Sequence, residues 1–492
     1  MPTLSLIPSL LPVPHFPQAP AGIHLPHARK IFALRDIHFR EVKAVGFDMD
    51  YTLSHYRSPE IDELAFRKSS LLLVRELGYP AWLLEQSFDP GFAVRGLVLD
   101  GNHGNLLKLS IERVPLRACH GTHPMAREDI DATYGRRRVV SSAQGYRSID
   151  TLFEIPESHL YAVLVDALDL GIVKDKSYLQ IFHDVRWAID SVHRNGDIKA
   201  EVLADRDFFI LKDPELPAAL DRWKRAGKKL FVVSNSEWAF TDGVLSHLLD
   251  GQDPARPAWE DYFDLVVTHS RKPVFFEEPQ PALPTEGHPR AFTGGNAGWL
   301  EQRLEAGGEE ILYIGDHIYG DILRSKKNVS WRTLLLIPEL GASLQRLEAR
   351  AEDIQEYLRS ETLRRQDSQR SSLLQDKLDR NREQRRLLAT RLSPEALRAL
   401  DHEAGQIRAE LEASQVRALA QEARVAGLDR DIEADFNARW GSIFRDGYQL
   451  TRFADQIQQY ACAYTGKISN LYFMDPGAAL YSPVPTLPHE RI

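Results

Sequence analysis

Short apolar runs that end at polar residues are the clearest pattern along the first two thirds of the chain. The runs cover residues 42–47, 230–233, 265–267 and 311–314. Continuous apolar runs of this length are typical of buried parallel strands, whose two faces are both covered. A helical pattern over residues 64–77 follows the first run. Because such strands alternate with helices, we predict an α/β fold with a doubly wound parallel sheet.

The spacing of these runs predicts an insertion in the sheet domain. About 180 residues separate the first run from the second, many more than a crossover connection requires. We therefore predict a sheet core formed by residues 41–78 and 211–341, and a cap domain formed by residues 79–210. The first 40 residues are rich in proline and are predicted to form an irregular arm.

Residues 342–439 have a different composition, rich in Leu, Ala, Glu, Gln and Arg and almost free of Gly and Pro. Ser393 and Pro394 form a natural helix start, so we predict two long helices folded back on each other. The leucines that repeat along them pack either helix against helix or as one amphipathic face on the core. These leucines are Leu374, Leu378, Leu387 and Leu388. The final segment, residues 440–492, is aromatic and is expected to pack on the core.

Composition narrows the class of protein. The chain has 492 residues, of which 43% are hydrophobic and 27% are charged, as in ordinary globular proteins. Its formal net charge is −9, and the arginines concentrate only near residue 380, so no nucleic-acid partner is expected. The two cysteines, Cys119 and Cys462, are too few for a disulfide framework and indicate a cytoplasmic protein. We find no signal peptide and no apolar run long enough to span a membrane.

The first apolar run ends at a pair of acids. Asp48 and Asp50 are followed by the hydroxyl of Thr52, in the pattern DxDxT. If the backbone turns here, the first carboxylate can attack phosphorus while the second donates a proton to the leaving oxygen. The alternative is a pair of solvated surface carboxylates. The pattern favours phosphoryl transfer through an aspartyl-phosphate.

Polar residues also follow the other three runs. Ser234 and Asn235 could hold phosphate oxygens, although such residues after a strand more often form an ordinary turn. Lys272 could balance the charge of a nucleophile and a phosphate, although a single lysine is usually solvated. Asp316 and Asp321 lie in a loop bracketed by glycines, and their hard oxygen atoms suit Mg²⁺. The four polar clusters are expected to converge at one edge of the sheet.

Taken together, the ordered clusters DxDxT, Ser-Asn, Lys-Pro and GDxxxxD resemble those of the haloacid dehalogenase-like (HAD-like) phosphatases. Longer stretches, among them GFDMDYTL, GLVLDGNHGNLLKL and ILYIGDHIYGDILRSKK, are similar to the cytosolic purine 5'-nucleotidases that prefer IMP and GMP. The resemblance covers most of residues 40–345 and 440–490. It implies a HAD-like sheet with an inserted cap. The long C-terminal helical hairpin predicted above is far longer than its counterpart in the animal enzymes, and the resemblance implies no role for it.

The resemblance implies a role for each cluster. Asp48 would be the nucleophile and Asp50 the general acid and base. Mg²⁺ would be held by the Asp48 carboxylate, the Asp50 carbonyl and Asp316, with Asp321 beside it. The residues that would bind phosphate are Thr52, Ser234, Asn235 and Lys272. Ser234 stands where the family usually has threonine, a change that keeps the hydroxyl.

The stretch HDVRWAIDSVHRNGDIK resembles the substrate loop of the same family. It places Arg186, Asp190 and Lys199 around a purine base and its phosphate. An ion pair between Arg186 and Asp190 on a solvated helix face is the alternative interpretation. Arg194 occupies a position where the animal enzymes carry an aromatic residue that stacks on the base. The residues that match an effector site for an activating nucleotide in animal relatives are Tyr319 and Lys327.

The sequence therefore predicts a Mg²⁺-dependent 5'-nucleotidase that hydrolyses purine nucleoside monophosphates of the IMP and GMP type. Phosphotransferase activity and a homo-oligomer, a dimer or a tetramer, are expected with it. Two alternatives remain open at this point. One is a scaffolding protein that uses the helical hairpin to bind partners, and the other is a phosphatase of sugar or other small phosphates.

Overall fold

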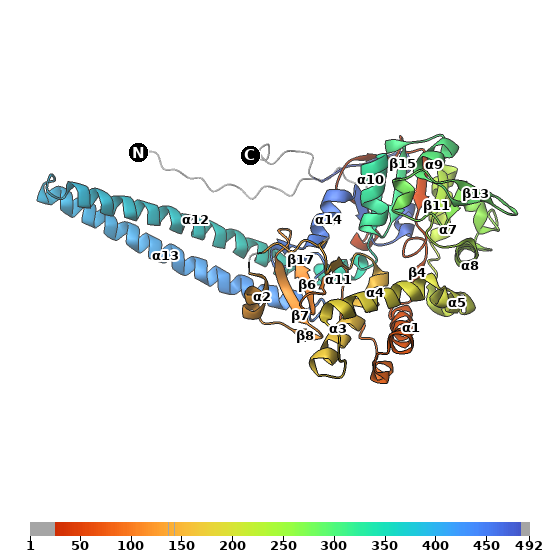
Figure 1. Cartoon of the computed structure of the whole chain (residues 1–492). Coiled ribbons are helices and arrows are strands. Elements are labelled where there is room, and N and C mark those ends of the chain that lie inside the picture. The colour runs from red at the N-terminus through yellow and green to blue at the C-terminus, as the bar shows by residue number, and fades with distance from the viewer. Residues whose placement is uncertain (1–24, 136, 142, 484–492) are drawn as a thin grey trace. The chain divides into compact units, whose positions relative to one another are not determined.

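The computed structural model describes residues 25–135, 137–141 and 143–483, which form two compact units. The first unit contains residues Met1–Ala342 and Ile443–Ile492, and the second contains Ser343–Ser442. Residues 1–24 of the predicted arm lie outside the described part of the chain. Figure 1 shows the chain coloured from its N-terminus to its C-terminus.

A nine-stranded sheet forms the centre of the first unit. Its order is β1 (Phe32–Ala33), β19 (Ala463–Thr465), β16 (Arg332–Leu336), β15 (Ile311–Gly315), β3 (Ala44–Phe47), β11 (Lys229–Val233), β12 (Leu265–Thr268), β14 (His288–Gly294) and β13 (Ala282–Thr285). The strands from β19 to β14 pair in parallel, and the two edge strands pair antiparallel. All four predicted strands are present, so the predicted fold class is confirmed.

The chain order reverses beside β3, which has β11 on one side and β15 on the other. Phe47 lies in register with Val232 of β11 and with Ile314 of β15. The residues that follow these three strands therefore emerge side by side at one edge of the sheet. In doubly wound sheets this reversal point is where ligands bind.

Each face of the central sheet is buried by helices. On one face Val45 and Phe47 pack with residues of α7 (Leu216–Arg225) and α8 (Trp238–Leu249). On the other face Phe231 packs with residues of α9 (Ala297–Leu304). Gly46 leaves room for the ring of Phe231 to lie over β3 on this face, because a Cβ atom at this position would lie 2.2 Å from that ring. Covered on both faces, β3 is rigid enough to hold the residues that follow it.

The insertion between β3 and β11 contains an antiparallel sheet and several helices. The sheet order is β8 (His123–Pro124), β7 (Pro115–His120), β6 (Asn105–Leu109), β5 (Val98–Asp100) and β9 (Tyr146–Ser148). The helices are α1 (Glu60–Leu77), α2 (Arg127–Tyr134), α3 (Ile155–Asp169), α4 (Tyr178–Arg194), α5 (Asp197–Ala204) and α6 (Arg206–Phe209). Helix α4 contacts α1 and α3, as Figure 1 shows.

The C-terminal segment joins the central sheet. Strand β19 pairs with β16 and with β1, so residues 32–33 of the predicted arm form an edge strand. Helix α14 (Arg452–Tyr460) precedes β19. Three small pairs of strands complete the unit: β4 (His55–Tyr56) with β10 (Ile210–Leu211), β17 (Arg445–Asp446) with β18 (Gln449–Leu450), and β2 (Ile37–His38) with β20 (Ala479–Leu480). In the described part of the chain, no helix combines the length and the apolar character needed to cross a membrane.

The second unit is a helical hairpin formed by α12 (Ala351–Leu388) and α13 (Pro394–Glu433), preceded by α11 (Leu340–Ala349). The break lies where it was predicted, and the Ser393 side chain caps α13 by accepting a hydrogen bond from the Ala396 N–H. Leu374 and Leu378 bury against Leu411, which confirms helix-to-helix packing for these two leucines. The same prediction is wrong for Leu387, which is 62% exposed, because near the tip of the hairpin it faces solvent.

Candidate active site

A sharp turn after β3 carries the first two acids of the predicted site. Tyr51 adopts a left-handed conformation with φ of 52°, and the N–H of Ser54 donates to the carbonyl of Met49 at 3.0 Å. Asp48, Asp50 and Thr52 are two residues apart in turn and would share one face of a regular strand, so the effect of the turn is to separate Thr52 from the two acids. Both acids line one pocket.

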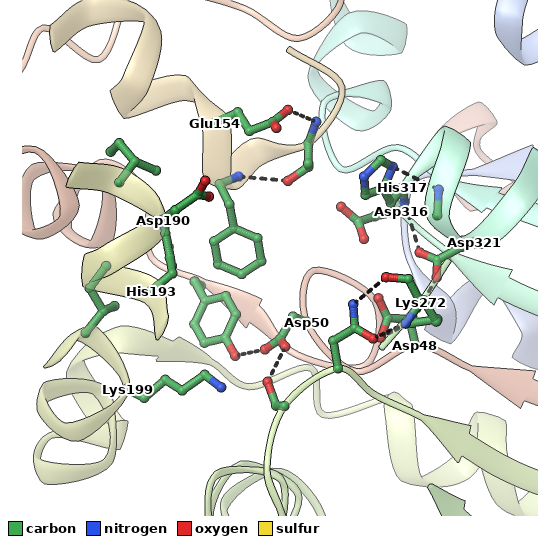
Figure 2. Close-up of a pocket in the computed structure, with 18 of the residues that line it drawn as sticks. Asp48, Asp50, Glu154, Asp190, His193, Lys199, Lys272, Asp316, His317 and Asp321 are labelled. Carbon is green, nitrogen blue, oxygen red and sulfur yellow. Dashed lines mark hydrogen bonds and ion pairs between the residues drawn. The ribbon is translucent and has the colours of Figure 1, made fainter. Parts of the chain in front are cut away.

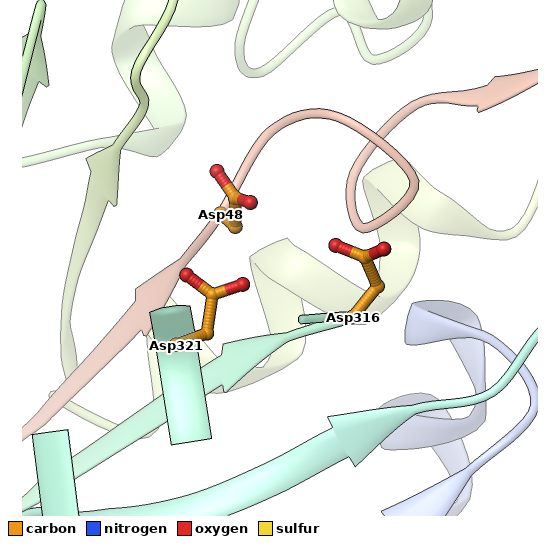
Figure 3. Close-up of side chains that lie close together, drawn as sticks. All are labelled: Asp48, Asp316 and Asp321. Atoms are coloured by element: carbon orange, nitrogen blue, oxygen red, sulfur yellow. The ribbon is translucent and has the colours of Figure 1, made fainter. Parts of the chain in front are cut away.

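Asp48, Asp316 and Asp321 form a carboxylate cluster (Figure 3). Each contributes an oxygen atom, and these atoms all lie within 4.8 Å of one another. Burial raises the pKa of Asp48 to about 7, against the opposing charge of Lys272. Burial, together with the charges of Asp321 and Asp48, raises the pKa of Asp316 well above its usual range. The cluster therefore concentrates negative charge on hard oxygen atoms, the ligand set that suits Mg²⁺.

Lys272 supplies the positive charge beside this cluster. Its Nζ lies 2.8 Å from Asp48 Oδ1 and 2.7 Å from Asp321 Oδ1, and it donates to the Tyr313 hydroxyl at 3.0 Å. Its side chain is only 4% exposed. Burial opposes its charge, but the carboxylates of Asp321 and Asp48 raise its pKa well above the usual range. Lys272 therefore stays charged and fixes the position of Asp48.

Asp50 lies between the cluster and the insertion, as Figure 2 shows. Its Oδ1 accepts a hydrogen bond from the Tyr56 hydroxyl, and its Oδ2 accepts one from Ser236 Oγ at 3.0 Å. Burial raises the pKa of Asp50, which keeps a larger fraction of it protonated near neutral pH. A buried carboxyl with a raised pKa is suited to donate a proton.

The loop after β11 contributes Asn235 and Ser236. Asn235 Oδ1 accepts from Ser270 Oγ at 2.8 Å and from the Lys272 N–H at 2.6 Å, so it ties this loop to the loop after β12. Ser234 is fully buried and does not line the pocket; its Oγ accepts from the Ser236 N–H at 3.0 Å. The sequence pointed to Ser234 and missed Ser236, two residues later in the same polar cluster.

Thr52 is the other predicted phosphate ligand that lies outside the pocket lining. Its side chain is fully buried, and within the described residues its hydroxyl has no hydrogen-bond partner. The turn at Tyr51 directs Asp48 and Asp50 into the pocket and leaves Thr52 behind them. The structure thus does not bring the hydroxyls of Thr52 and Ser234 to the carboxylate cluster.

The cluster forms one end of a cavity of about 600 Å³, a size common for pockets that bind small molecules. The predicted residues that line it are Asp48, Asp50, Arg186, Asp190, Lys199, Asn235, Lys272, Asp316, Tyr319 and Asp321. In Figure 2 the cluster and Lys272 lie on one side, while Asp190 and His193 lie on the other. The cavity is therefore bounded by the sheet edge and by the insertion.

The insertion side is charged. Arg186 of α4 forms the ion pair with Asp190 that its spacing allowed, and its Nη1 also lies 2.8 Å from Glu157 Oε2. Glu157 is almost completely buried. Lys199 of α5 lies 2.6 Å from Glu237. The helical ion pair of the alternative interpretation is present and lines the pocket, and the role of Arg186 and Asp190 in binding a base stays a prediction.

Two rings on this side were not predicted from the sequence. Phe153, in the short helix Leu152–Glu154, and His193 both line the pocket, with ring centroids 5.4 Å apart. Burial lowers the pKa of His193 to about 4, so its imidazole is neutral. Arg194 is exposed at the end of α4 and does not line the pocket. His193 lay within the stretch compared with the substrate loop, whereas nothing in the sequence marked Phe153.

The two predicted effector residues are not brought together at this pocket. Tyr319, in the π-helical turn η7 (Ile318–Leu323), lines the cavity itself. Its hydroxyl accepts from Arg452 at 3.0 Å and from Gln456 at 2.6 Å. Lys327 is exposed on α10 (Arg324–Val329) and does not line the cavity. Tyr319 lies on the same side of the pocket as Asp316 because only His317 separates Asp316 from the start of η7.

The chain is similar in sequence to several 5'-nucleotidase proteins. A model of the 5' nucleotidase family matches residues 31–492. A 5'-nucleotidase domain-containing protein of Dictyostelium discoideum is 27% identical over 484 residues, which are 94% of this chain and 74% of that protein. The 5'-nucleotidase domain-containing protein 2 of Rattus norvegicus and that of Homo sapiens are each 26% identical over 485 residues. These alignments cover 94% of this chain and 80% and 85% of the relatives.

Proposed function

The chain belongs to the 5' nucleotidase family, and on that premise we propose that it hydrolyses purine nucleoside 5'-monophosphates with Asp48 as the nucleophile. Membership of this family makes the chain a 5'-nucleotidase hydrolase. The preference for a purine base, the cation and the covalent mechanism are our proposal. The observation that carries the proposal is the carboxylate cluster beside Lys272 and Asp50, at one end of a pocket of about 600 Å³. The other end of the pocket has room and rings for a nucleoside.

In the first step, Asp48 Oδ attacks the phosphorus atom and the bond to the nucleoside oxygen breaks. Lys272, 2.8 Å from Asp48, favours the ionised form of that carboxylate and orients it. Asp50, with its raised pKa, donates the proton that the leaving oxygen needs. In the second step the ionised Asp50 takes a proton from water, which hydrolyses the aspartyl-phosphate. A nucleoside hydroxyl in place of that water would give phosphotransferase activity.

Mg²⁺ fits the carboxylate cluster. The oxygen atoms of Asp48, Asp316 and Asp321 lie close enough to share one cation, and burial of like charges raises the pKa of Asp48 and Asp316. Asp48, Asp316 and the Asp50 carbonyl would hold the ion, with Asp321 supporting them. When bound, it would offset the negative charge shared by nucleophile and phosphate.

Asn235 and Lys272 line the pocket beside the nucleophile and would bind the phosphate oxygens. Ser234 and Thr52 would act only indirectly, because both hydroxyls are buried behind the pocket. Ser234 holds the N–H of Ser236 and thereby the loop that carries Asn235. Phosphate recognition is therefore assigned to an amide and an ammonium group, which replace the two hydroxyls in that role.

A purine would occupy the insertion side of the pocket. Phe153 and the neutral ring of His193 offer flat apolar faces on which a base can stack. Asp190 suits the N–H edge of a 6-oxopurine, and Arg186 suits its carbonyl oxygen. Lys199 lines the pocket nearer to Asp50, where it would meet the ribose or the phosphate.

A substrate panel tests this function. IMP, GMP, AMP, CMP, ribose 5-phosphate and glucose 6-phosphate are each supplied with Mg²⁺ and, in parallel, with EDTA, and phosphate release is measured. We expect IMP and GMP to give the highest kcat/KM and EDTA to abolish release. Faster hydrolysis of a sugar phosphate than of every nucleotide would overturn the assignment of the base pocket. No hydrolysis of any nucleotide with Mg²⁺ present would favour the scaffolding alternative.

The same proposal includes a cytoplasmic homo-oligomer, a dimer or a tetramer, that an activating nucleotide could regulate. Cys119 and Cys462 are both buried and are not joined to each other by a disulfide, which fits a reducing compartment. The helical hairpin of the second unit is the element we assign to assembly. Light scattering of the full chain and of a chain lacking residues 345–435 compares the two masses, and equal protomer numbers would remove that role from the hairpin.

A further inference from the structure

A buried arginine lies behind the carboxylate cluster. Arg95, just before β5, is 1% exposed. Its Nε and Nη2 donate to Glu339 Oε1 and Oε2 at 2.8 and 2.6 Å, and its Nη1 donates to the carbonyl of Asp316 at 3.2 Å. The guanidinium also lies 5.2 Å from the ring centroid of Phe453. A buried charge is unfavourable unless it is paired and hydrogen-bonded, and Glu339 supplies that pairing.

The bond from Arg95 fixes one peptide group of the cluster. The peptide between Asp316 and His317 carries the carbonyl that Arg95 binds, and its N–H donates to Asp321 Oδ2 at 3.2 Å. A trans peptide is planar and its C=O and N–H point in opposite directions, so these two bonds hold the plane from both sides. The rotation of that plane sets the backbone from which the Asp316 carboxylate extends.

The same peptide connects Arg95 to the rest of the cluster. Asp321, which accepts from the peptide N–H, is also held by Lys272 at 2.7 Å, and Lys272 holds Asp48 at 2.8 Å. A continuous set of bonds therefore runs from Arg95 through Asp321 and Lys272 to Asp48. A substitution of Arg95 would remove the hydrogen bond to the Asp316 carbonyl, which is the bond in this set that positions Asp316.

The local backbone is shaped for this contact. Gly96 has φ of +89°, and a Cβ atom there would lie 2.6 Å from the Cβ of Phe453. Only glycine permits the chain to pass α14 this closely. The approach is what allows the Arg95 side chain to reach across Phe453 to Asp316.

We propose that Arg95 is a positioning residue, which orients Asp316 so that the carboxylate cluster binds a divalent cation. The inference rests on the proposed function in one respect, because the cation is the Mg²⁺ of that reaction. Arg95 does not line the pocket and touches no substrate, so it acts only through Asp316.

The chain offers a matched control at Arg256. Its Nε and Nη2 lie 3.1 and 3.0 Å from Asp221 Oδ1, and its Nη1 donates to the carbonyl of Asp261 at 3.2 Å. Its guanidinium lies 5.7 Å from the ring centroid of Tyr262. Arg256 thus makes the same kinds of contact as Arg95, but it does not line the pocket or touch the carboxylate cluster.

The test compares the full-length variants Arg95→Met, Arg95→Lys and Arg256→Met with wild type. Binding of Mn²⁺ to the metal-free proteins without nucleotide is followed by electron paramagnetic resonance of the free ion, and the thermal midpoint Tm is measured alongside. We expect Arg95→Met to weaken Mn²⁺ binding by about tenfold or more. Arg95→Lys should be intermediate, because it keeps the charge and loses the paired donors. Arg256→Met should lower Tm and leave Mn²⁺ affinity unchanged.

Wild-type Mn²⁺ affinity in Arg95→Met would overturn the inference and leave Arg95 a purely structural residue. If that variant does not fold, Glu339→Gln takes its place. This substitution removes the negative charge that pairs with the Arg95 guanidinium and keeps the side chain at nearly the same size. We expect a several-fold loss of affinity there, and none would again overturn the inference. Since binding is measured without nucleotide, a wild-type protein that binds Mn²⁺ but hydrolyses no nucleotide would refute the proposed function alone.

Discussion

Replacing Asp48 with asparagine should abolish turnover and at the same time stabilise the metal-free protein at alkaline pH. Burial raises the pKa of Asp48 from 3.8 to about 7 in the folded state. The unfolded chain therefore releases this proton at lower pH than the folded chain does. As pH rises from about 4 to about 7, folding becomes less favourable by roughly 1.4 kcal/mol per pH unit.

The size of the effect follows from the two pKa values. Below pH 3.8 both states are protonated and the carboxyl does not affect folding. Above about pH 7 both states are ionised, and the folded state is disfavoured by about 4 kcal/mol. At pH 5.5 the same calculation gives roughly 2 kcal/mol. Asp48→Asn removes this penalty, so its stability advantage over wild type should grow by about 2 kcal/mol between pH 5.5 and pH 8.

The stability change is measured by urea denaturation of the first unit in EDTA, at pH 5.5 and at pH 8. Turnover is measured by phosphate release from IMP. Asp62→Asn is the control, since Asp62 is 7% exposed, lies outside the pocket lining and has a pKa raised by burial to about 6. The stability advantage of Asp62→Asn over wild type should grow less between pH 5.5 and pH 8, and this variant should retain turnover. An advantage of Asp48→Asn that stays constant with pH would refute the argument from buried charge, and turnover near wild type would refute the nucleophile.

Two further substitutions test the pocket and the hairpin. Phe153→Ala should raise KM for IMP about tenfold, because a stacked ring contributes about 1 kcal/mol or more, with little change for ribose 5-phosphate; equal effects on both substrates would show that the ring does not contact the base. Leu378→Ala, which empties part of the buried contact with Leu411, should destabilise the hairpin by about 2–5 kcal/mol in urea unfolding followed by circular dichroism. Turnover should persist in this variant, and its loss would show that catalysis depends on the hairpin.

The central strands could be predicted because they are buried on both faces. Each expected run falls on β3, β11, β12 or β15, with boundaries that differ by at most two residues. The edge strand β1 has only two residues and β19 has only three. Strands this short contain too few residues to show a recognisable pattern of apolar positions. The insertion's sheet was missed for a different reason. Its strand β6 is buried throughout yet contains Asn105 and Lys108, so it does not form an apolar run.

The charged part of the site could be predicted for a topological reason. Asp48, Lys272 and Asp316 follow β3, β12 and β15, which are parallel strands of one sheet, so their carboxyl ends lie at the same edge. Which way a hydroxyl faces after such a strand depends on the turn, and Thr52 and Ser234 turn away from the pocket for this reason. Phe153 comes from a short helix far along the insertion, where packing of the whole domain decides which side chain faces the cavity.

The geometry that makes the site unfavourable when empty is also what would let it hold a cation. Asp48, Asp316 and Asp321 are buried together, and Lys272 forms ion pairs with Asp48 and Asp321. Burial, together with the charges of the neighbouring carboxylates, raises the pKa of both Asp48 and Asp316. A divalent ion bound here would supply the missing positive charge and would stabilise the folded state, which alone brings these carboxylates together. Saturating Mg²⁺ should therefore return both carboxyls to low pKa and flatten the fall of stability between pH 5.5 and pH 8. A fall as steep with Mg²⁺ as with EDTA would mean that the cluster does not bind the ion.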